Sequence, residues 1–138
     1  MPVRKNAKIA LLRQIPLFAH CGGRELEEIA AIADELSLPE GRELTREGEA
    51  GREFVAIVAG EAVVRRQGRT IATLREGDFF GEMALVTGRP RNATVVAATP
   101  LRTLVIVDRA FRSLLESSPA IQAMVLRAVA ERVPADET

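Results

Sequence analysis

The sequence predicts a mainly β fold with flanking helices. We expect an eight-stranded β-roll, similar to a jelly roll, with helices before it, one short helix inside it and two helices after it. Apolar residues recur at helical spacing near both ends of the chain. Between residues 39 and 107 the apolar runs are short or alternating, and regularly spaced glycine turns separate them. The length of 138 residues suits one domain over residues 1–138.

Two helices are predicted in the N-terminal part, residues 1–38. The first covers residues 7–17, where apolar residues recur at helical spacing until Pro16 closes the segment. The second begins at Gly23 and has one broad apolar stripe before Pro39, so it should pack on a core. The stripe consists of Leu26, Ile29, Ala30, Ile32, Ala33 and Leu36.

The β-roll is predicted over residues 39–107. Each turn contains a glycine, which we expect to adopt a positive φ. The turns are Glu47-Gly48, Ala59-Gly60, Gln67-Gly68 and Glu76-Gly77. The predicted strands are Glu43 to Arg46, Glu53 to Val58, Ala62 to Arg66, Arg69 to Leu74, Asn92 to Thr99 and Leu101 to Val107.

Two further helices are predicted over residues 108–133. Asp108 is a suitable N-cap for the first, which has Phe111 on its apolar side, and Ser118-Pro119 starts the second. Residues 134–138 are expected to form a frayed tail.

Charge and hydropathy exclude several classes of protein. The 19 Lys and Arg residues balance 19 Asp and Glu residues, so no global positive field attracts nucleic acid. The apolar runs are far shorter than the roughly 20 residues that a membrane helix requires. No signal-type apolar run follows the basic N-terminus. We expect a cytoplasmic protein with no nucleic-acid partner and no membrane segment in this chain.

The single cysteine and single histidine argue against an enzyme. Cys21 alone can form neither an internal disulfide nor a CxxC pair, and His20 alone cannot supply a zinc or cupin-type site. His20 and Cys21 could suggest a base and a nucleophile, but adjacent residues seldom direct their side chains at one another. A loop or helix-cap role before Gly22 is therefore favoured for both residues. We expect no catalytic residue, no metal and no cofactor. A metal-dependent enzyme with a cupin-like roll would need clustered ligands.

The segment at residues 79–94 interrupts the strand pattern. Gly81 lets the backbone approach a ligand closely, and residues 82–86 suit a single helical turn whose first N–H groups are free. Such a helix start attracts phosphate, and Arg91, at the start of the next strand, can add charge-assisted hydrogen bonds. This combination predicts an anion site.

Glu82 narrows the choice of anion. A carboxylate beside a phosphate repels the ligand unless it accepts a hydrogen bond from a ligand group, and a ribose 2′-hydroxyl is such a donor. A 3′,5′-cyclic nucleotide carries both groups close together. A nucleoside triphosphate fits less well, because the chain has no GxxxxGK[ST] loop.

The same segment also carries a family resemblance. It matches a pattern of the form FGE-x-A-L, a short spacer, then Pro-Arg, a small or polar residue, Ala and Thr. The matching positions are Gly81, Glu82, Ala84, Leu85, Pro90, Arg91, Ala93 and Thr94. This pattern resembles the phosphate-binding cassette of cyclic-nucleotide-binding domains, as in catabolite activator proteins, protein kinase A regulatory subunits and cyclic-nucleotide-gated channels. The resemblance covers nearly the whole chain and suits a stand-alone, bacterial-like domain.

The resemblance implies a role for each cassette residue. It assigns Arg91 to the cyclic phosphate and Glu82 to the ribose 2′-hydroxyl. It assigns the backbone at Gly81, Met83 and Ala84 to the phosphate or the sugar.

The base pocket follows from the same resemblance. Val64, Leu74 and Met83 would line it, and Arg132 in the last helix would cap the base. Asn92 departs from the small or hydroxyl residue usual after the arginine; a threonine there is associated with cGMP in the family. We expect cAMP rather than cGMP.

Two functions are consistent with these residues. The first is a regulatory sensor, in which a bound cyclic nucleotide repositions the C-terminal helices toward an unidentified effector protein. The alternative is a ligand-free structural or protein-interaction domain with a degenerate cassette, in which Arg91 and Glu82 pair with each other.

Arg65, Arg66 and Arg69 form a basic hairpin tip, for which a solvated or edge-blocking role is favoured.

Overall fold

The computed structural model describes residues 4–15, 18–81 and 93–136, without the side chains of residues 128, 129 and 131–136. The chain forms two compact units. One is Asp34–Asp108, which contains all the strands. The other is helical and combines Met1–Ala33 with Arg109–Thr138.

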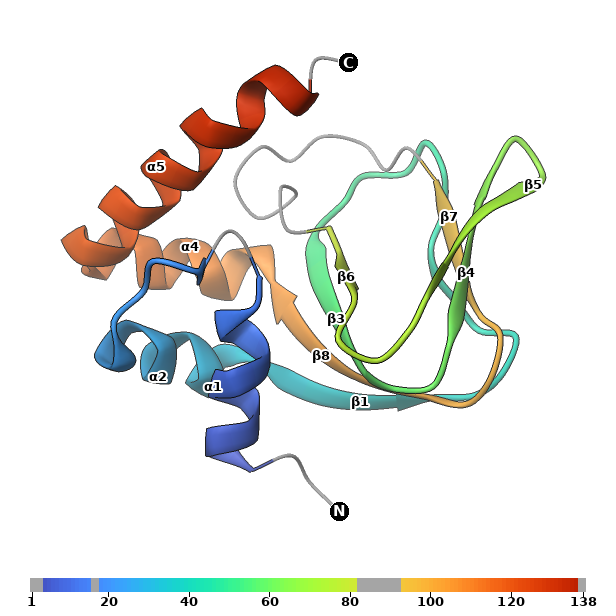
Figure 1. The fold of residues 1–138 in the computed structure, drawn as a ribbon, viewed down its shortest axis with the longest axis horizontal. Coiled ribbons are helices and arrows are strands. Elements are labelled where there is room, and N and C mark those ends of the chain that lie inside the picture. The colour runs from blue at the N-terminus through green and yellow to red at the C-terminus, as the bar shows by residue number, and fades with distance from the viewer. Residues whose placement is uncertain (1–3, 16–17, 82–92, 137–138) are drawn as a thin grey trace. The chain divides into compact units, whose positions relative to one another are not determined.

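The strand unit is the predicted β-roll (Figure 1). The described residues form eight strands in two four-stranded antiparallel sheets, with the orders β1-β8-β3-β6 and β2-β7-β4-β5. The strands are β1 (Asp34–Leu38), β2 (Glu43–Thr45), β3 (Glu53–Ala59), β4 (Ala62–Arg66), β5 (Arg69–Leu74), β6 (Phe79–Phe80), β7 (Thr94–Ala97) and β8 (Leu101–Val107).

The two sheets share one apolar cluster. Ile57 and Leu101 come from the first sheet and Ala62, Val95 and Ala97 from the second, and each is at most 3% exposed. Residues from both sheets therefore face one another across the inside of the roll, and their burial holds the sheets together.

The turn glycines behave as predicted. Gly48, Gly60, Gly68 and Gly77 all have positive φ, between 79° and 97°. Gly60, in the turn between β3 and β4, is also crowded. A Cβ there would lie 2.4 Å from the Pro100 carbonyl oxygen. This turn therefore has room only for glycine.

The helical unit has its own buried side chains. The rings of Phe18 and Phe111 lie 6.0 Å apart between centroids, and both residues are fully buried. No helix among the described residues is long and apolar enough to span a membrane. The helices are α1 (Lys5–Arg13), α2 (Gly23–Ile32), α4 (Asp108–Ser117) and α5 (Pro119–Asp136).

The predicted second helix was wrong at its C-terminal end. Helix α2 stops at Ile32, and Asp34–Leu38 forms β1, which pairs with β8. Leu36 is 44% exposed in this strand, and its carbonyl oxygen accepts a hydrogen bond from the buried Thr103 hydroxyl. Pairing with a distant strand overrides the helical spacing that Leu36 shares with the apolar stripe.

Other boundaries differ by a few residues. Helix α1 starts at Lys5 and ends at Arg13, before the Pro16 at which we expected it to end. Helix α5 continues to Asp136, so it includes part of the predicted tail at residues 134–138. The predicted short helix at residues 82–86 lies outside the described residues.

We predict that Gly60→Ala destabilises the roll by at least about 2 kcal/mol, since it combines left-handed strain with the Pro100 clash. Gly68→Ala is the matched control: φ is also positive there, but no atom lies within 4 Å of the added Cβ. It should cost only about 1 kcal/mol. Chemical denaturation of both variants measures the difference, and equal losses would contradict the role of the clash.

Candidate functional site

The predicted cassette is described at its two ends. Glu82, Met83, Ala84, Arg91 and Asn92 lie outside the described residues, so their predicted roles are not tested by contacts. Before this stretch the chain leaves β6 in the first sheet, and after it the chain enters β7 in the second. The segment therefore connects the two sheets of the roll.

A tight turn leads into the segment. The Asp78 N–H donates to the Arg75 carbonyl oxygen at 2.9 Å, and the Asp78 carboxylate accepts the Arg75 N–H at 2.8 Å. Within this turn the Gly77 N–H donates to the Ile57 carbonyl oxygen on β3. The chain then forms β6 and reaches Gly81, whose φ of +81° directs it out of the strand. The entry to the segment is thus fixed against β3.

The exit from the segment is fixed against β2 and β4. Ala93 is 6% exposed, and Thr94 begins β7. Val95 pairs with Val64 on β4. The Thr94 hydroxyl oxygen accepts a hydrogen bond from the Glu47 N–H at 3.0 Å, which attaches the start of β7 to the turn after β2.

Val64 and Leu74, which were predicted to line the base pocket, lie on the inner side of the roll. Both are partly buried and pack against the apolar cluster inside the roll. Leu74 pairs with Ala62, and Val64 is two residues further along β4, so both side chains are on the inner face of the sheet. Their contact with a base stays a prediction.

Residues 35–118 match the family described as cyclic nucleotide-binding domain. The chain belongs to this family. The match extends from the second residue of β1 to the residue after α4, so it includes nearly the whole roll and all of the predicted cassette.

Several relatives support this assignment. A cAMP-dependent protein kinase regulatory subunit of Yarrowia lipolytica is 34% identical over 114 residues, which are 81% of this chain and 30% of that protein. A cyclic nucleotide-gated potassium channel of Rhizobium etli is 37% identical over 122 residues, which are 88% of this chain and 34% of that protein. The chain thus spans about a third of the length of these curated relatives.

A solved structure supports the fold. The N-terminal domain of a transcriptional regulator from Streptomyces coelicolor has a TM-score of 0.82 and 29% sequence identity to this cyclic nucleotide-binding domain. The similarity covers 91% of this chain and 94% of that structure. The likeness therefore extends beyond the cassette to nearly all of the chain.

Arg132 belongs to α5, the last helix of this cyclic nucleotide-binding domain. Its side chain lies outside the description, so its predicted contact with the base stays a prediction.

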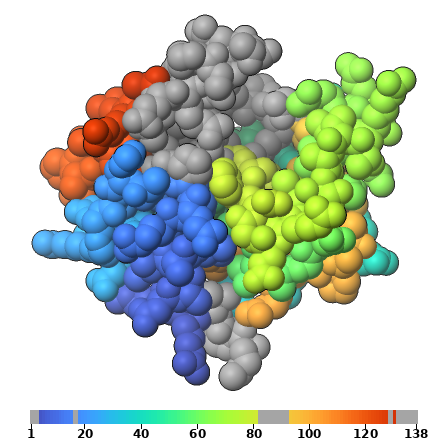
Figure 2. All heavy atoms as spheres, in the orientation of Figure 1, coloured from blue at the N-terminus to red at the C-terminus, as the bar shows by residue number. Residues whose placement is uncertain are grey.

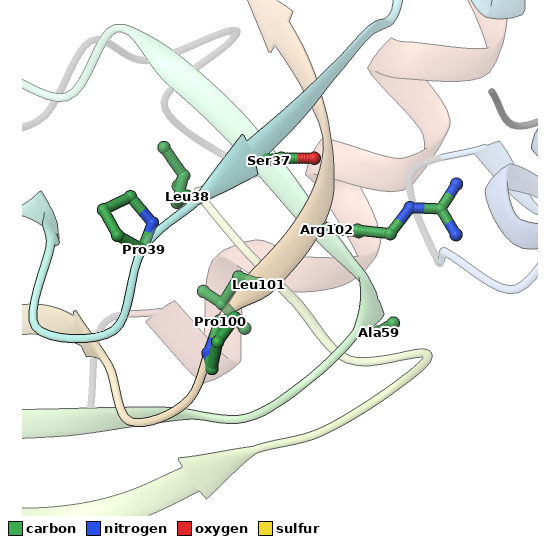
Figure 3. A pocket seen from close by; sticks show the side chains of 7 residues that line it. All are labelled: Ser37, Leu38, Pro39, Ala59, Pro100, Leu101 and Arg102. Carbon is green, nitrogen blue, oxygen red and sulfur yellow. The ribbon is translucent and has the colours of Figure 1, made fainter. Parts of the chain in front are cut away.

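An open cavity of about 480 Å³ is lined by none of the predicted site residues that the structure describes (Figure 3). It is lined mainly by apolar side chains near Leu38, Pro39 and Pro100, at the end of β7 opposite to Thr94. Arg102 lies at its edge and forms an ion pair with Glu35 at 2.5 Å. The cavity is therefore separate from both described ends of the cassette.

Cys21 has the properties of a buried thiol. It is 7% exposed, and its Sγ lies 3.5 Å from the Met124 Sδ. Burial raises the pKa of the thiol from 9.0 to about 11, and the nearby Glu25 carboxylate adds to this increase. An activated thiolate needs the opposite shift. In the part of the chain that the structure describes, no group of three or more His, Cys, Asp or Glu side chains is placed to hold a metal ion.

Sequence reasoning missed the residues that hold the ends of the cassette. Thr94 was identified only as a matching position, and Glu47 only as part of a glycine turn. A pattern of turns does not show which side chain reaches another loop 47 residues away. A polar residue directly before a turn glycine was the signal available.

The shifted pKa of Cys21 predicts a pH-dependent stability. Because the pKa is higher in the folded state, the thiol contributes stability below pH 9.0, and this contribution is lost as the pH rises toward about 11. The free energy of unfolding should therefore fall more steeply over this range in the wild type than in Cys21→Ala. Denaturation at several pH values measures both slopes, and equal slopes would show that the pKa of the thiol is not raised in the folded state.

Proposed function

We propose that this domain binds a 3′,5′-cyclic nucleotide as a regulatory sensor module and does no chemistry on it. The observation that carries the proposal is the family match over residues 35–118, which includes the whole cassette. The described ends of the cassette support it, because they are fixed on the two sheets between which a ligand would lie.

The chemistry of the cassette supports a cyclic phosphate as the anchored group. In our proposal Arg91 donates charge-assisted hydrogen bonds to the phosphate, and the N–H groups at Gly81, Met83 and Ala84 add backbone donors. Glu82 accepts the ribose 2′-hydroxyl. These groups bind and orient the ligand, and none of them is arranged as a nucleophile with a base.

We propose cAMP as the preferred ligand. The Yarrowia relative is the regulatory subunit of a cAMP-dependent protein kinase, while the description of the Rhizobium relative as a cyclic nucleotide-gated channel does not specify the base. In the proposed pocket Val64, Leu74 and Met83 contact the base, Asn92 lies beside the phosphate or the purine edge, and Arg132 covers the base from α5. The inner face of the roll around Val64 and Leu74 is apolar, which suits packing against the flat, weakly polar face of a base.

We propose that ligand binding repositions α4 and α5, and that an unidentified effector protein responds to these helices. A ligand shifts such an equilibrium only if it binds one arrangement more tightly than the other. A lone buried thiol suits a reducing compartment, which supports a cytoplasmic location for this module.

Titration calorimetry with cAMP and cGMP tests the ligand directly. We expect saturable binding of both, with cAMP tighter. Arg91→Ala should weaken cAMP binding by at least about 2 kcal/mol, or about 30-fold, because it removes the charged hydrogen bonds to the phosphate. Arg89→Ala is the matched control: it removes an equal charge two residues away, and its affinity should stay near that of the wild type.

Two results would contradict the proposal. The first is a wild-type protein that binds neither nucleotide at high micromolar concentration. The second is a loss of stability in Arg91→Ala without any change in nucleotide affinity. The latter would favour the ligand-free interaction domain, in which Arg91 and Glu82 pair with each other.

A further inference from the structure

Glu47 connects three segments of the roll. It lies in the turn that follows β2, and its N–H donates to the Thr94 hydroxyl oxygen at 3.0 Å. Its Oε1 accepts the N–H of Gln67, in the β4–β5 turn, at 3.0 Å. One residue thus holds the start of β7 with its backbone and the tip of the β4–β5 hairpin with its carboxylate.

These contacts begin where the strand pairing becomes irregular. The β2–β7 register shifts between Glu43 and Thr45, directly before the turn that contains Glu47. The β4–β5 register shifts between Val64 and Arg65, two residue pairs before the tip that contains Gln67. Bulges loosen and twist a ladder. Beyond them, the two hydrogen bonds of Glu47 continue the connection between the segments.

The hairpin tip contains a backbone conformation that is uncommon for a residue with a side chain. Gln67 has a φ of +52°, a strained value for a residue with a side chain, and it is the only such residue in the described part of the chain. The β4–β5 hairpin lies at the surface of the molecule (Figure 2). The Glu47 carboxylate accepts the hydrogen bond of the Gln67 N–H and so stabilises this turn conformation.

Both partners of Glu47 lie next to groups that our proposed function assigns to the ligand. Thr94 is three residues after Arg91, at the point where the cassette joins β7. The hairpin includes Val64, which pairs with Val95, the neighbour of Thr94. A shift of the Glu47 turn would therefore displace both the end of the cassette and the strand that carries a base contact.

We propose that Glu47 and Thr94 are positioning residues of the nucleotide site. They hold the exit of the cassette against the β2–β3 turn and the β4–β5 hairpin, so that Arg91 and Val64 face the same ligand. This inference rests on the proposed function. Neither residue touches the ligand, and each acts through the segment that it holds.

Thr99 provides a matched control at the other end of β7. Its hydroxyl oxygen accepts the Glu61 N–H at 3.0 Å, as the Thr94 hydroxyl oxygen accepts the Glu47 N–H, and the Thr99 hydroxyl also donates to the Pro100 carbonyl oxygen. Thr99 lies in the turn between β7 and β8, away from the cassette. Thr94→Val and Thr99→Val thus remove the same chemical group at the start of β7 and in the turn that follows β7.

The test is cAMP titration of the full chain by calorimetry, with denaturation of each variant. We expect Thr94→Val to weaken binding about fivefold, the effect of one lost hydrogen bond on the position of the cassette. Thr94→Ser restores the hydroxyl and should bind within about twofold of the wild type. Thr99→Val should lose at least as much stability as Thr94→Val, because its hydroxyl makes two hydrogen bonds, and it should keep wild-type affinity.

The carboxylate is tested separately. Glu47→Ala removes the acceptor for Gln67 but keeps the Glu47 N–H, and it should weaken cAMP binding about threefold. Glu47→Gln keeps an oxygen acceptor and should bind nearly as the wild type. Because this side chain is exposed, the variants should fold even if Thr94→Val does not.

The outcomes distinguish this inference from the proposed function. If the wild type binds cAMP and both Thr94→Val and Glu47→Ala bind it equally well, the positioning role is wrong and the proposed function stands. An equal loss of affinity in Thr99→Val would also overturn the inference, since it would show a general effect of stability. If the wild type binds no cyclic nucleotide, the proposed function itself fails.

Discussion

The pairing of β3 with β8 is the interaction on which the roll depends. Phe54, Ala56 and Leu104 lie on one face of this pair and are at most 1% exposed, and Val55 and Val105 on the other face are 4% exposed. Strands buried on both faces cannot change register without displacing side chains on each side. The first sheet adds β1 to β8 and β6 to β3, so the start of the cassette is positioned by this pair.

Much of the roll could be predicted because its turns are local. A glycine between two short apolar runs indicates a turn wherever it occurs, and Gly60 and Gly77 adopt the expected positive φ. Strand β1 could not be predicted in this way. Leu36 continues the helical stripe as well as it alternates with Leu38 along a strand, and the choice depends on β8, more than 60 residues away.

In the candidate site, too, features carried by one continuous segment could be predicted, and contacts between separate segments could not. The cassette is a continuous segment, so its phosphate-binding pattern around Arg91 is visible in the sequence, and the family match includes it. Val64 and Leu74 were placed by resemblance, and the structure puts both on the inner face of the roll. The contacts of Glu47 join three separate loops. No local sequence pattern indicates these contacts, because the three loops come together only in the folded roll.

The pairing of β1 with β8 has a consequence for the order in which the chain folds. The hydrogen bond from Thr103 to the Leu36 carbonyl oxygen closes a loop of 67 residues. During synthesis the first strand leaves the ribosome long before its partner, whereas the β4–β5 hairpin is complete after a short turn. Contacts that close long loops form late because of their entropic cost. The nascent roll should therefore present an unpaired first edge until its last strand has been made.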